Sequence, residues 1–216
     1  MNHKTLNVRP EEEGVTHLNI SPRSVFPACR ALYPTATGKL IDSYMGFSYE
    51  SLIAPIRYMR FKDKDMFKTL MSLDRRDAQA LYREISSSHH EQKLIANFQS
   101  AIRFIVWERA VLDAGYRNDL FDLGYYKLYS YDVITNTDNG ANLSSAKPTN
   151  YNTWLPKIYT TVIQALKEGR APQFASSKQG PWYRDIPSLR DDPEALKHFA
   201  DGIALLTERS KEFKEY

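Results

Sequence analysis

The sequence of 216 residues contains one cysteine, Cys29, which excludes an internal disulfide bond and suits a reducing compartment. We predict that Cys29 packs in the core, with a nucleophile as the alternative. The sequence has no apolar run near the ~20 residues that cross a bilayer, and Met1–Gly14 lacks the apolar region of a signal peptide. These absences predict a cytoplasmic protein with no membrane partner.

An excess of one charge and the standard catalytic motifs are also missing. The 29 basic and 26 acidic residues give a formal net charge of +3, so any polyanion contact must come from local clustering. There is no Walker loop, no G-x-G-x-x-G after a strand, no G-x-S-x-G and no H-E-x-x-H. His89 and His90 are adjacent and would diverge on a helix, so we predict no metal site and no cofactor.

The composition, 42% hydrophobic and 25% charged, fits one globular domain. We predict an α+β fold that is mostly helical, with a few short strands and a C-terminal helical extension. The expected divisions are a flexible segment at 1–14, a domain at 15–168, and a connector with a C-terminal helix packed on the domain at 169–216. THLNIS at 16–21 and KLYSYDVI at 127–134 predict strands, and the polar segment 135–150 predicts a long surface loop.

Apolar residues at three- and four-residue spacing predict the helices. The first starts at Ser48 as N-cap and bends at Pro55. The strongest pattern covers 91–115, where Gly115 is expected to end the helix. The other predicted helices cover 64–72, the segment from Asp74, the segment 154–166, and a last helix that begins at Pro193 after the cap Asp192.

One carboxylate, Glu50, stands at the start of the aromatic and basic segment GFSYESLIAPIRYMRF. On a continuous helix, Glu50 and Arg57 would share one face about 10 Å apart, because each residue adds about 1.5 Å. This is roughly the separation between a glycosidic bond and the phosphate of a nucleotide. The alternative is that Arg57 pairs with a nearby acid such as Asp77.

The segment from Glu50 to Tyr58 resembles the signature of the NADAR superfamily (YbiA-like proteins), in which a Glu opens the first active-site helix. Arg57 and Tyr58 stand where the family has Lys-Phe. In the next helix, DAQALYRE is similar to the family's Ala-basic-x-x-Gly-Arg element through Arg83, with Tyr82 in place of Gly.

Further segments extend the resemblance over about 16–166 in phage versions of the family. KLYSYD resembles the strand that brings an Asp, here Asp132, into the pocket, and THLNIS and NYNTWLPKIYTTVIQAL resemble the opening strand and the closing helix. The sequence also departs from the family: Leu32 replaces a polar Asn, Ser51 and Ala54 replace a His and a Gln, and no Trp-Gly follows Asp132.

The resemblance implies an N-glycosidase that removes ADP-ribosyl groups, for example from guanine in nucleic acid. A carboxylate stabilises the positive charge that develops on the ribose, and aromatic rings stack on the leaving base. The resemblance assigns catalysis to Glu50 and Asp132 and phosphate binding to Arg57 and Arg83. The candidates for stacking are Tyr49, Tyr58, Tyr82 and Trp107, with burial as the alternative for Trp107.

Two other functions stay open. The missing Asn, His and Gln favour a NADAR-like scaffold without turnover, which binds an ADP-ribosyl ligand or a protein such as an ADP-ribosyl transferase toxin. A nucleic-acid module built from basic helices and tyrosines is the third hypothesis. Phage versions of the family imply a counter-defence that reverses or blocks ADP-ribosylation in the host cytoplasm, with modified nucleic acid as a partner.

Overall fold

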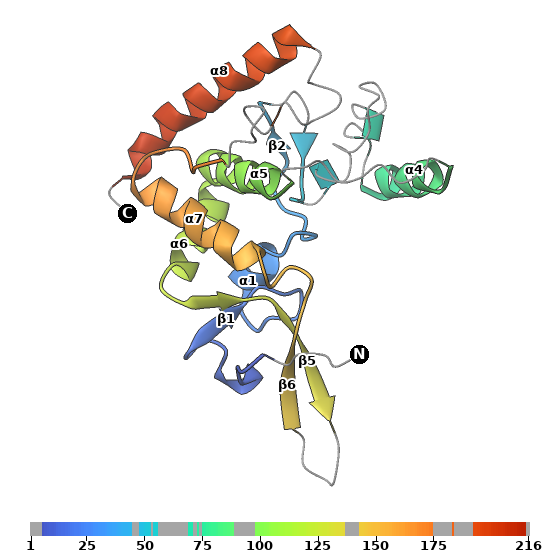
Figure 1. Cartoon of the computed structure of the whole chain (residues 1–216), viewed down its shortest axis with the longest axis vertical. Coiled ribbons are helices and arrows are strands. Elements are labelled where there is room, and N and C mark those ends of the chain that lie inside the picture. Colours follow the sequence, from blue (N-terminus) through green and yellow to red (C-terminus); the bar gives the residue numbers. More distant parts are fainter. Residues whose placement is uncertain are drawn as a thin grey trace.

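The computed structural model describes residues 6–44, 48–52, 54–55, 69–70, 73, 75–88, 98–136, 143–174, 183 and 192–214. The protein combines helices and strands, as an α+β class predicts, and three of its helices pack against α5, Phe98–Leu112 (Figure 1). Helix α5 packs against α6, Ala114–Leu123, and against α7, Leu155–Lys167, and α8, Pro193–Ser210. The side chains at the centre of this packing are fully buried: Ala101, Phe104, Ile105, Val106, Trp107 and Ala110.

The described strands form three separate two-stranded sheets. β1, His17–Asn19, pairs in parallel with β4, Lys127–Tyr129, and this confirms the strand predicted at 16–21. β2, Ile41–Asp42, pairs antiparallel with β3, Ser48–Tyr49. β5, Tyr131–Asn136, and β6, Leu143–Pro148, form an antiparallel hairpin that projects from the lower end of the molecule in Figure 1.

Two predictions about residues 127–150 were wrong. The expected single strand is divided between two sheets, because Ser130 leaves β4 and binds elsewhere: its N–H donates to Asn152 Oδ1 at 2.9 Å and its hydroxyl to the Ile20 carbonyl at 2.9 Å. The expected loop contains strand β6, which pairs with β5. Its polar residues suit a hairpin with exposed side chains as well as they suit a loop.

The prediction that Gly115 ends the central helix was also wrong. Helix α5 ends at Leu112, and Asp113 adopts an extended backbone, with φ −120° and ψ 108°. The Asp113 carboxylate then accepts hydrogen bonds from the Gly115 and Tyr116 N–H groups at 3.0 and 3.3 Å. Asp113 is therefore the N-cap of α6, a helix that the sequence analysis missed.

The last two helices confirm their predictions. α7 buries the expected face, including Ile158, Val162 and Leu166. α8 begins at Pro193, and the Asp192 carboxylate accepts from the Ala195 N–H at 2.9 Å. The short 3-10 helix η4, Lys211–Phe213, follows it.

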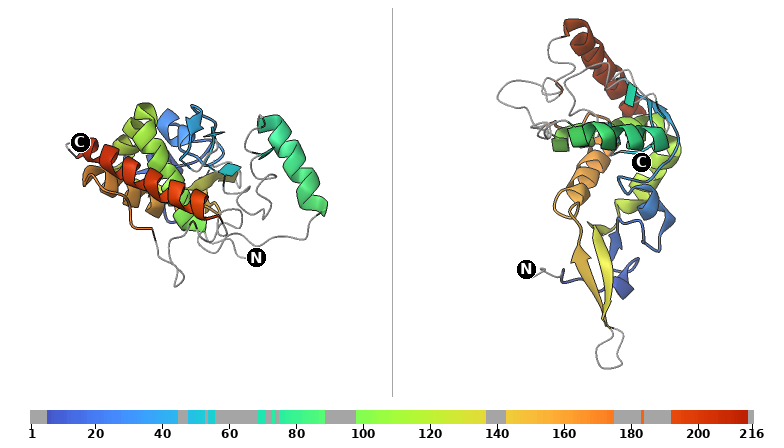
Figure 2. Two further views of the ribbon diagram at one scale, coloured as in Figure 1. Left: turned by 90° about the horizontal axis from the view of Figure 1, so that it is seen from above. Right: turned by 90° about the vertical axis from the view of Figure 1, so that its right-hand side faces the viewer.

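The C-terminal helix contributes to the core. The Phe199 ring of α8 lies 5.0 Å from the Phe104 ring of α5, measured between centroids. A Cβ on Gly202 would lie 2.6 Å from the Cβ of Tyr44, so glycine permits α8 to approach the segment after β2. Figures 1 and 2 show α4, Arg75–Ser88, standing apart from this helical group.

Helix α4 confirms the helix expected near Asp74, which itself lies outside the described residues, and Ala78 is buried on it. Of the predicted helix 64–72, the described residues Thr69 and Leu70 are helical. The predicted Ser48 cap was wrong, because Ser48 lies in β3, where its hydroxyl donates to Asp42 Oδ1 at 2.5 Å. Of the apolar residues that predicted this first helix, Ile53, Ile56 and Met59 lie outside the described residues.

Residues 6–44 contain more structure than their sequence suggested. In the segment expected to be flexible, η1, Pro10–Glu12, is a 3-10 helix, and the Leu6 N–H donates to the Ala146 carbonyl of β6 at 3.0 Å. A short helix, α1 at Pro27–Ala31, forms where the sequence predicted none. Cys29 is fully buried on α1, as predicted, and burial raises the pKa of its thiol to about 11.

In the part of the chain that the structure describes, no helix has the length and apolar character of a membrane span.

Candidate functional site

Glu50 follows strand β3 and carries an exposed side chain on a fixed main chain. The Glu50 carbonyl accepts the Gly38 N–H at 3.0 Å and Nη1 of Arg109 at 2.8 Å. The second bond is charge-assisted and its donor is buried, so it is stronger than an ordinary peptide hydrogen bond. The peptide at Glu50 is thus held in place while its carboxylate reaches solvent.

A buried acid that the sequence analysis missed, Glu108 of α5, holds the two strands that lead to Glu50. The Ser43 hydroxyl lies 3.0 and 2.9 Å from the two Glu108 oxygens, and the Tyr44 N–H donates to Oε1 at 2.9 Å. From β3, the Tyr49 hydroxyl donates to Oε2 at 3.2 Å. One carboxylate therefore joins the end of β2 to β3.

The neighbouring residue, Arg109, is also buried, with 4% of its surface exposed. Its guanidinium carbon lies 4.8 Å from the centroid of the Tyr116 ring, a cation–π contact in a site shielded from water. A Cβ on Gly38 would lie 1.9 Å from Nη2 of Arg109, so the guanidinium in its present position requires glycine there. The signal in the sequence was the charged pair Glu108-Arg109 inside an apolar helix, WERA.

Burial and hydrogen bonding have opposite effects on the pKa of Glu108. Burial raises the pKa of Glu108 from 4.5 to about 7, and the hydrogen bonds from Tyr44, Ser43 and Tyr49 only partly offset this effect. Burial, and then the charge of Glu108, raise the pKa of Tyr49 well above its ordinary value. Tyr49 therefore stays protonated and donates to Glu108.

The raised pKa of Glu108 predicts a loss of stability with rising pH. The folded protein holds this proton more tightly than the unfolded chain, so the contribution is fully present below pH 4.5 and is lost as the pH rises through about 7. The loss amounts to about 3 kcal/mol. Urea unfolding of wild type and Glu108→Gln at several pH values measures it, because the variant lacks this part of the slope.

The matched control for this experiment is Glu212→Gln, at an exposed position of η4. We expect it to keep the wild-type dependence on pH. Equal slopes for wild type and Glu108→Gln would contradict the assignment.

The structure places two predicted stacking residues in the core. Trp107 is fully buried, with its ring 6.2 Å from Phe104 and 6.1 Å from Phe174, as its alternative interpretation held. Tyr49 is 2% exposed. Its side chain points from β3 toward α5, where the hydroxyl lies 3.3 Å from the Ile105 carbonyl oxygen. Neither ring is available to a base at the surface.

Among the other predicted site residues, the structure separates Asp132 from Glu50. Asp132 is exposed on β5, where its register partner is Lys147, on the hairpin at the far end of the molecule from the β2–β3 sheet (Figure 1). Arg83 is exposed on α4. Arg57, Tyr58 and the side chain of Tyr82 lie outside the described residues. The predicted helical face shared by Glu50 and Arg57 is therefore not described. Glu50 itself lies in a bend after β3.

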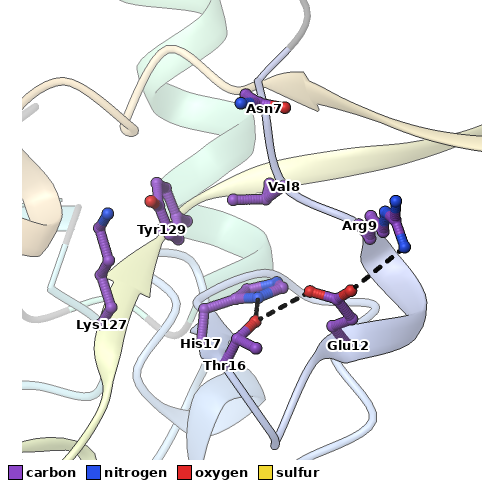
Figure 3. Close-up of a pocket in the computed structure, with 8 residues that line it drawn as sticks. All are labelled: Asn7, Val8, Arg9, Glu12, Thr16, His17, Lys127 and Tyr129. Carbon is purple, nitrogen blue, oxygen red and sulfur yellow. Dashed lines mark hydrogen bonds and ion pairs between the residues drawn. The ribbon is translucent and has the colours of Figure 1, made fainter.

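A separate pocket of about 340 Å³ opens where the N-terminal segment meets β1 and β4 (Figure 3). Its lining consists of Asn7, Val8, Arg9, Glu12, Thr16, His17, Lys127 and Tyr129. His17 is buried and both its ring nitrogens have partners, the Thr16 hydroxyl at 3.0 Å and the Tyr131 hydroxyl at 2.8 Å. Burial lowers the pKa of His17, so its neutral ring supports the pocket wall and has no free nitrogen for a ligand.

Comparison with known proteins matches no family model, no curated protein and no solved structure. Within the described ranges, no cluster of three or more His, Cys, Asp or Glu side chains could hold a metal ion.

Proposed function

We propose that the protein is an N-glycosidase that hydrolyses the N-glycosidic bond of an ADP-ribosyl group, such as ADP-ribosylated guanine in nucleic acid, with Glu50 as its carboxylate. The observation that supports this proposal is the anchoring of Glu50. Two hydrogen bonds hold its carbonyl, one of them from the buried Arg109, while its side chain stays exposed. These bonds fix the backbone of Glu50, and a carboxylate carried at this position can stabilise a cationic transition state.

In the proposed reaction, the bond between ribose C1′ and the base nitrogen breaks with its electron pair on the base. Positive charge develops on the ribose, and the Glu50 carboxylate stabilises it at close range. Water supplies a hydroxyl group to C1′ and its proton passes to the departing base. One carboxylate is sufficient for these steps, so the position of Asp132 on another hairpin is compatible with the reaction.

The phosphates of the ligand require cations near Glu50. Arg83 and Arg57 remain the proposed phosphate ligands, since a guanidinium binds phosphate oxygens through two parallel hydrogen bonds. Arg83 is exposed on α4.

The direct test is incubation of the protein with DNA that carries ADP-ribosylated guanine, followed by mass spectrometry of free ADP-ribose. We expect release of ADP-ribose and recovery of unmodified guanine. Intact modified DNA after prolonged incubation, at enzyme concentrations close to that of the substrate, would contradict the proposed hydrolysis.

A second candidate function is binding without turnover, either to an ADP-ribosyl group or to a protein such as an ADP-ribosyl transferase. The burial of Tyr49 and Trp107 favours it, because both rings are removed from the set expected to stack on a base. Calorimetric titration with ADP-ribose separates the two functions. A binding protein gives saturable heat but leaves the modified DNA intact, whereas a hydrolase releases ADP-ribose.

A further inference from the structure

The strongest unassigned feature of the described structure is the pair of buried ionisable side chains on α5. Glu108 is fully buried and Arg109 is 4% exposed, although burial of charge is costly unless hydrogen bonds compensate it. Both side chains direct their hydrogen bonds to one short stretch of chain, the segment 38–50, in its described residues 38–44 and 48–50. Burial of two adjacent ionisable side chains on one helix costs free energy. The hydrogen bonds that offset this cost all go to the segment 38–50, which indicates that its position matters.

The contacts hold this segment at both ends and in the middle. Glu108 binds Ser43 and Tyr44 after β2, and Tyr49 on β3. Arg109 binds the Glu50 carbonyl, which also accepts the Gly38 N–H. A side chain at position 38 would displace the Arg109 guanidinium, because a Cβ there would lie 1.9 Å from Nη2.

We propose that Glu108 and Arg109 are positioning residues that set the place and direction of the Glu50 carboxylate. This inference rests on the proposed function for its catalytic consequence. Glu108 fixes the strands that lead to Glu50, and Arg109 fixes the Glu50 peptide itself. A reacting group displaced by about 1 Å can lose a factor of about 100 in rate, so the cost of losing either contact falls on turnover.

The test compares Arg109→Met, which removes the donors and keeps an apolar stem, with Arg109→Lys, which keeps a cation and a donor. We expect Arg109→Met to lower kcat by about 10- to 100-fold with little change in KM. Arg109→Lys should recover part of the loss. In the Glu50→Gln background, Arg109→Met should cause no further loss, because it acts through a carboxylate that is already absent.

The matched control is Arg117→Met on α6. Arg117 also donates to main-chain carbonyls, those of Ala110 and Val111, and its guanidinium lies 4.0 Å from the centroid of the Phe213 ring. It therefore has the same kinds of contact, and these join α6 to α5 and η4. We expect Arg117→Met to lower the melting temperature and to leave kcat unchanged below that temperature.

Hydrogen exchange provides a readout that does not depend on turnover. Arg109→Met and Glu108→Gln should both increase exchange in peptides covering 38–50, whereas Arg117→Met should not. Unchanged exchange in this segment, or equal kcat losses with and without Glu50→Gln, would overturn the inference. Normal turnover by Glu50→Gln alone would instead overturn the proposed function, and the exchange measurement would still decide whether α5 anchors the segment.

Discussion

Substitution of Glu50 by glutamine is expected to lower the rate of ADP-ribose release by about 100- to 1000-fold. Glutamine has nearly the shape of glutamate and keeps the hydrogen bonds of the main chain, since these belong to the Glu50 carbonyl. The variant therefore loses only the negative charge that opposes the developing cation on the ribose. Single-turnover release of ADP-ribose from modified DNA, followed by mass spectrometry, measures the effect on chemistry without a contribution from product release.

The matched control is Asp42→Asn on strand β2, next to β3 in the same hairpin. Asp42 is exposed, and asparagine can still accept the hydrogen bond from Ser48. This variant removes an acidic charge near Glu50 and should leave turnover unchanged. Near-normal turnover by Glu50→Gln would refute the mechanism. If the protein only binds its ligand, Glu50→Gln should change affinity little, because a neutral amide can still hydrogen-bond a ribose hydroxyl.

The second large effect is expected at the core. Trp107→Ala should lower the free energy of unfolding by about 3–5 kcal/mol, because it leaves a cavity among Phe104, Phe174 and the rest of α5's packing. Trp107→Phe should cost much less. Phenylalanine keeps most of the apolar contact. It also loses no hydrogen bond, because the Trp107 Nε1 has no hydrogen-bond partner among the described residues. Urea unfolding measures both variants.

Trp154 supplies the comparison for this experiment. It precedes α7, is only partly buried, and packs edge-on against the Tyr151 ring at 5.4 Å. Trp154→Ala should therefore destabilise the protein less than Trp107→Ala. If Trp107→Ala kept its stability but lost affinity for ADP-ribose, Trp107 would be a stacking residue, contrary to its burial.

For the candidate site, the sequence identified a position and missed its supports. Glu50 stood out because it is one acid at the edge of an aromatic and basic segment, and the structure gives it an exposed side chain on a fixed peptide. Glu108 and Arg109 were passed over because charged residues on helices usually face solvent. Their partners at Ser43, Tyr49 and Glu50 lie 59 to 65 positions away in the chain, beyond the range of any local pattern.

The same limit explains the errors at strand and helix ends. Ser48 follows the rule for an N-cap, yet pairing with Asp42 draws it into β3. The residues of 127–134 alternate as one strand should, yet the chain passes at Ser130 from the β1 partner to the β6 partner. Strand pairing depends on which distant segment is within reach, and alternation alone cannot specify it.

By itself, the sequence determined the helices whose apolar stripes are long and whose ends carry their own signals. α7 and α8 follow from local spacing, and the Asp192 cap with Pro193 acts within a single turn, so neighbouring residues contain all the information required. Only the tertiary structure decided that Asp132 and Glu50 stand on different hairpins, that Tyr49 and Trp107 are core residues, and that two buried charges on α5 hold the Glu50 segment. These outcomes depend on contacts between residues far apart in the chain, whose free energies arise only when the elements pack together and water is excluded.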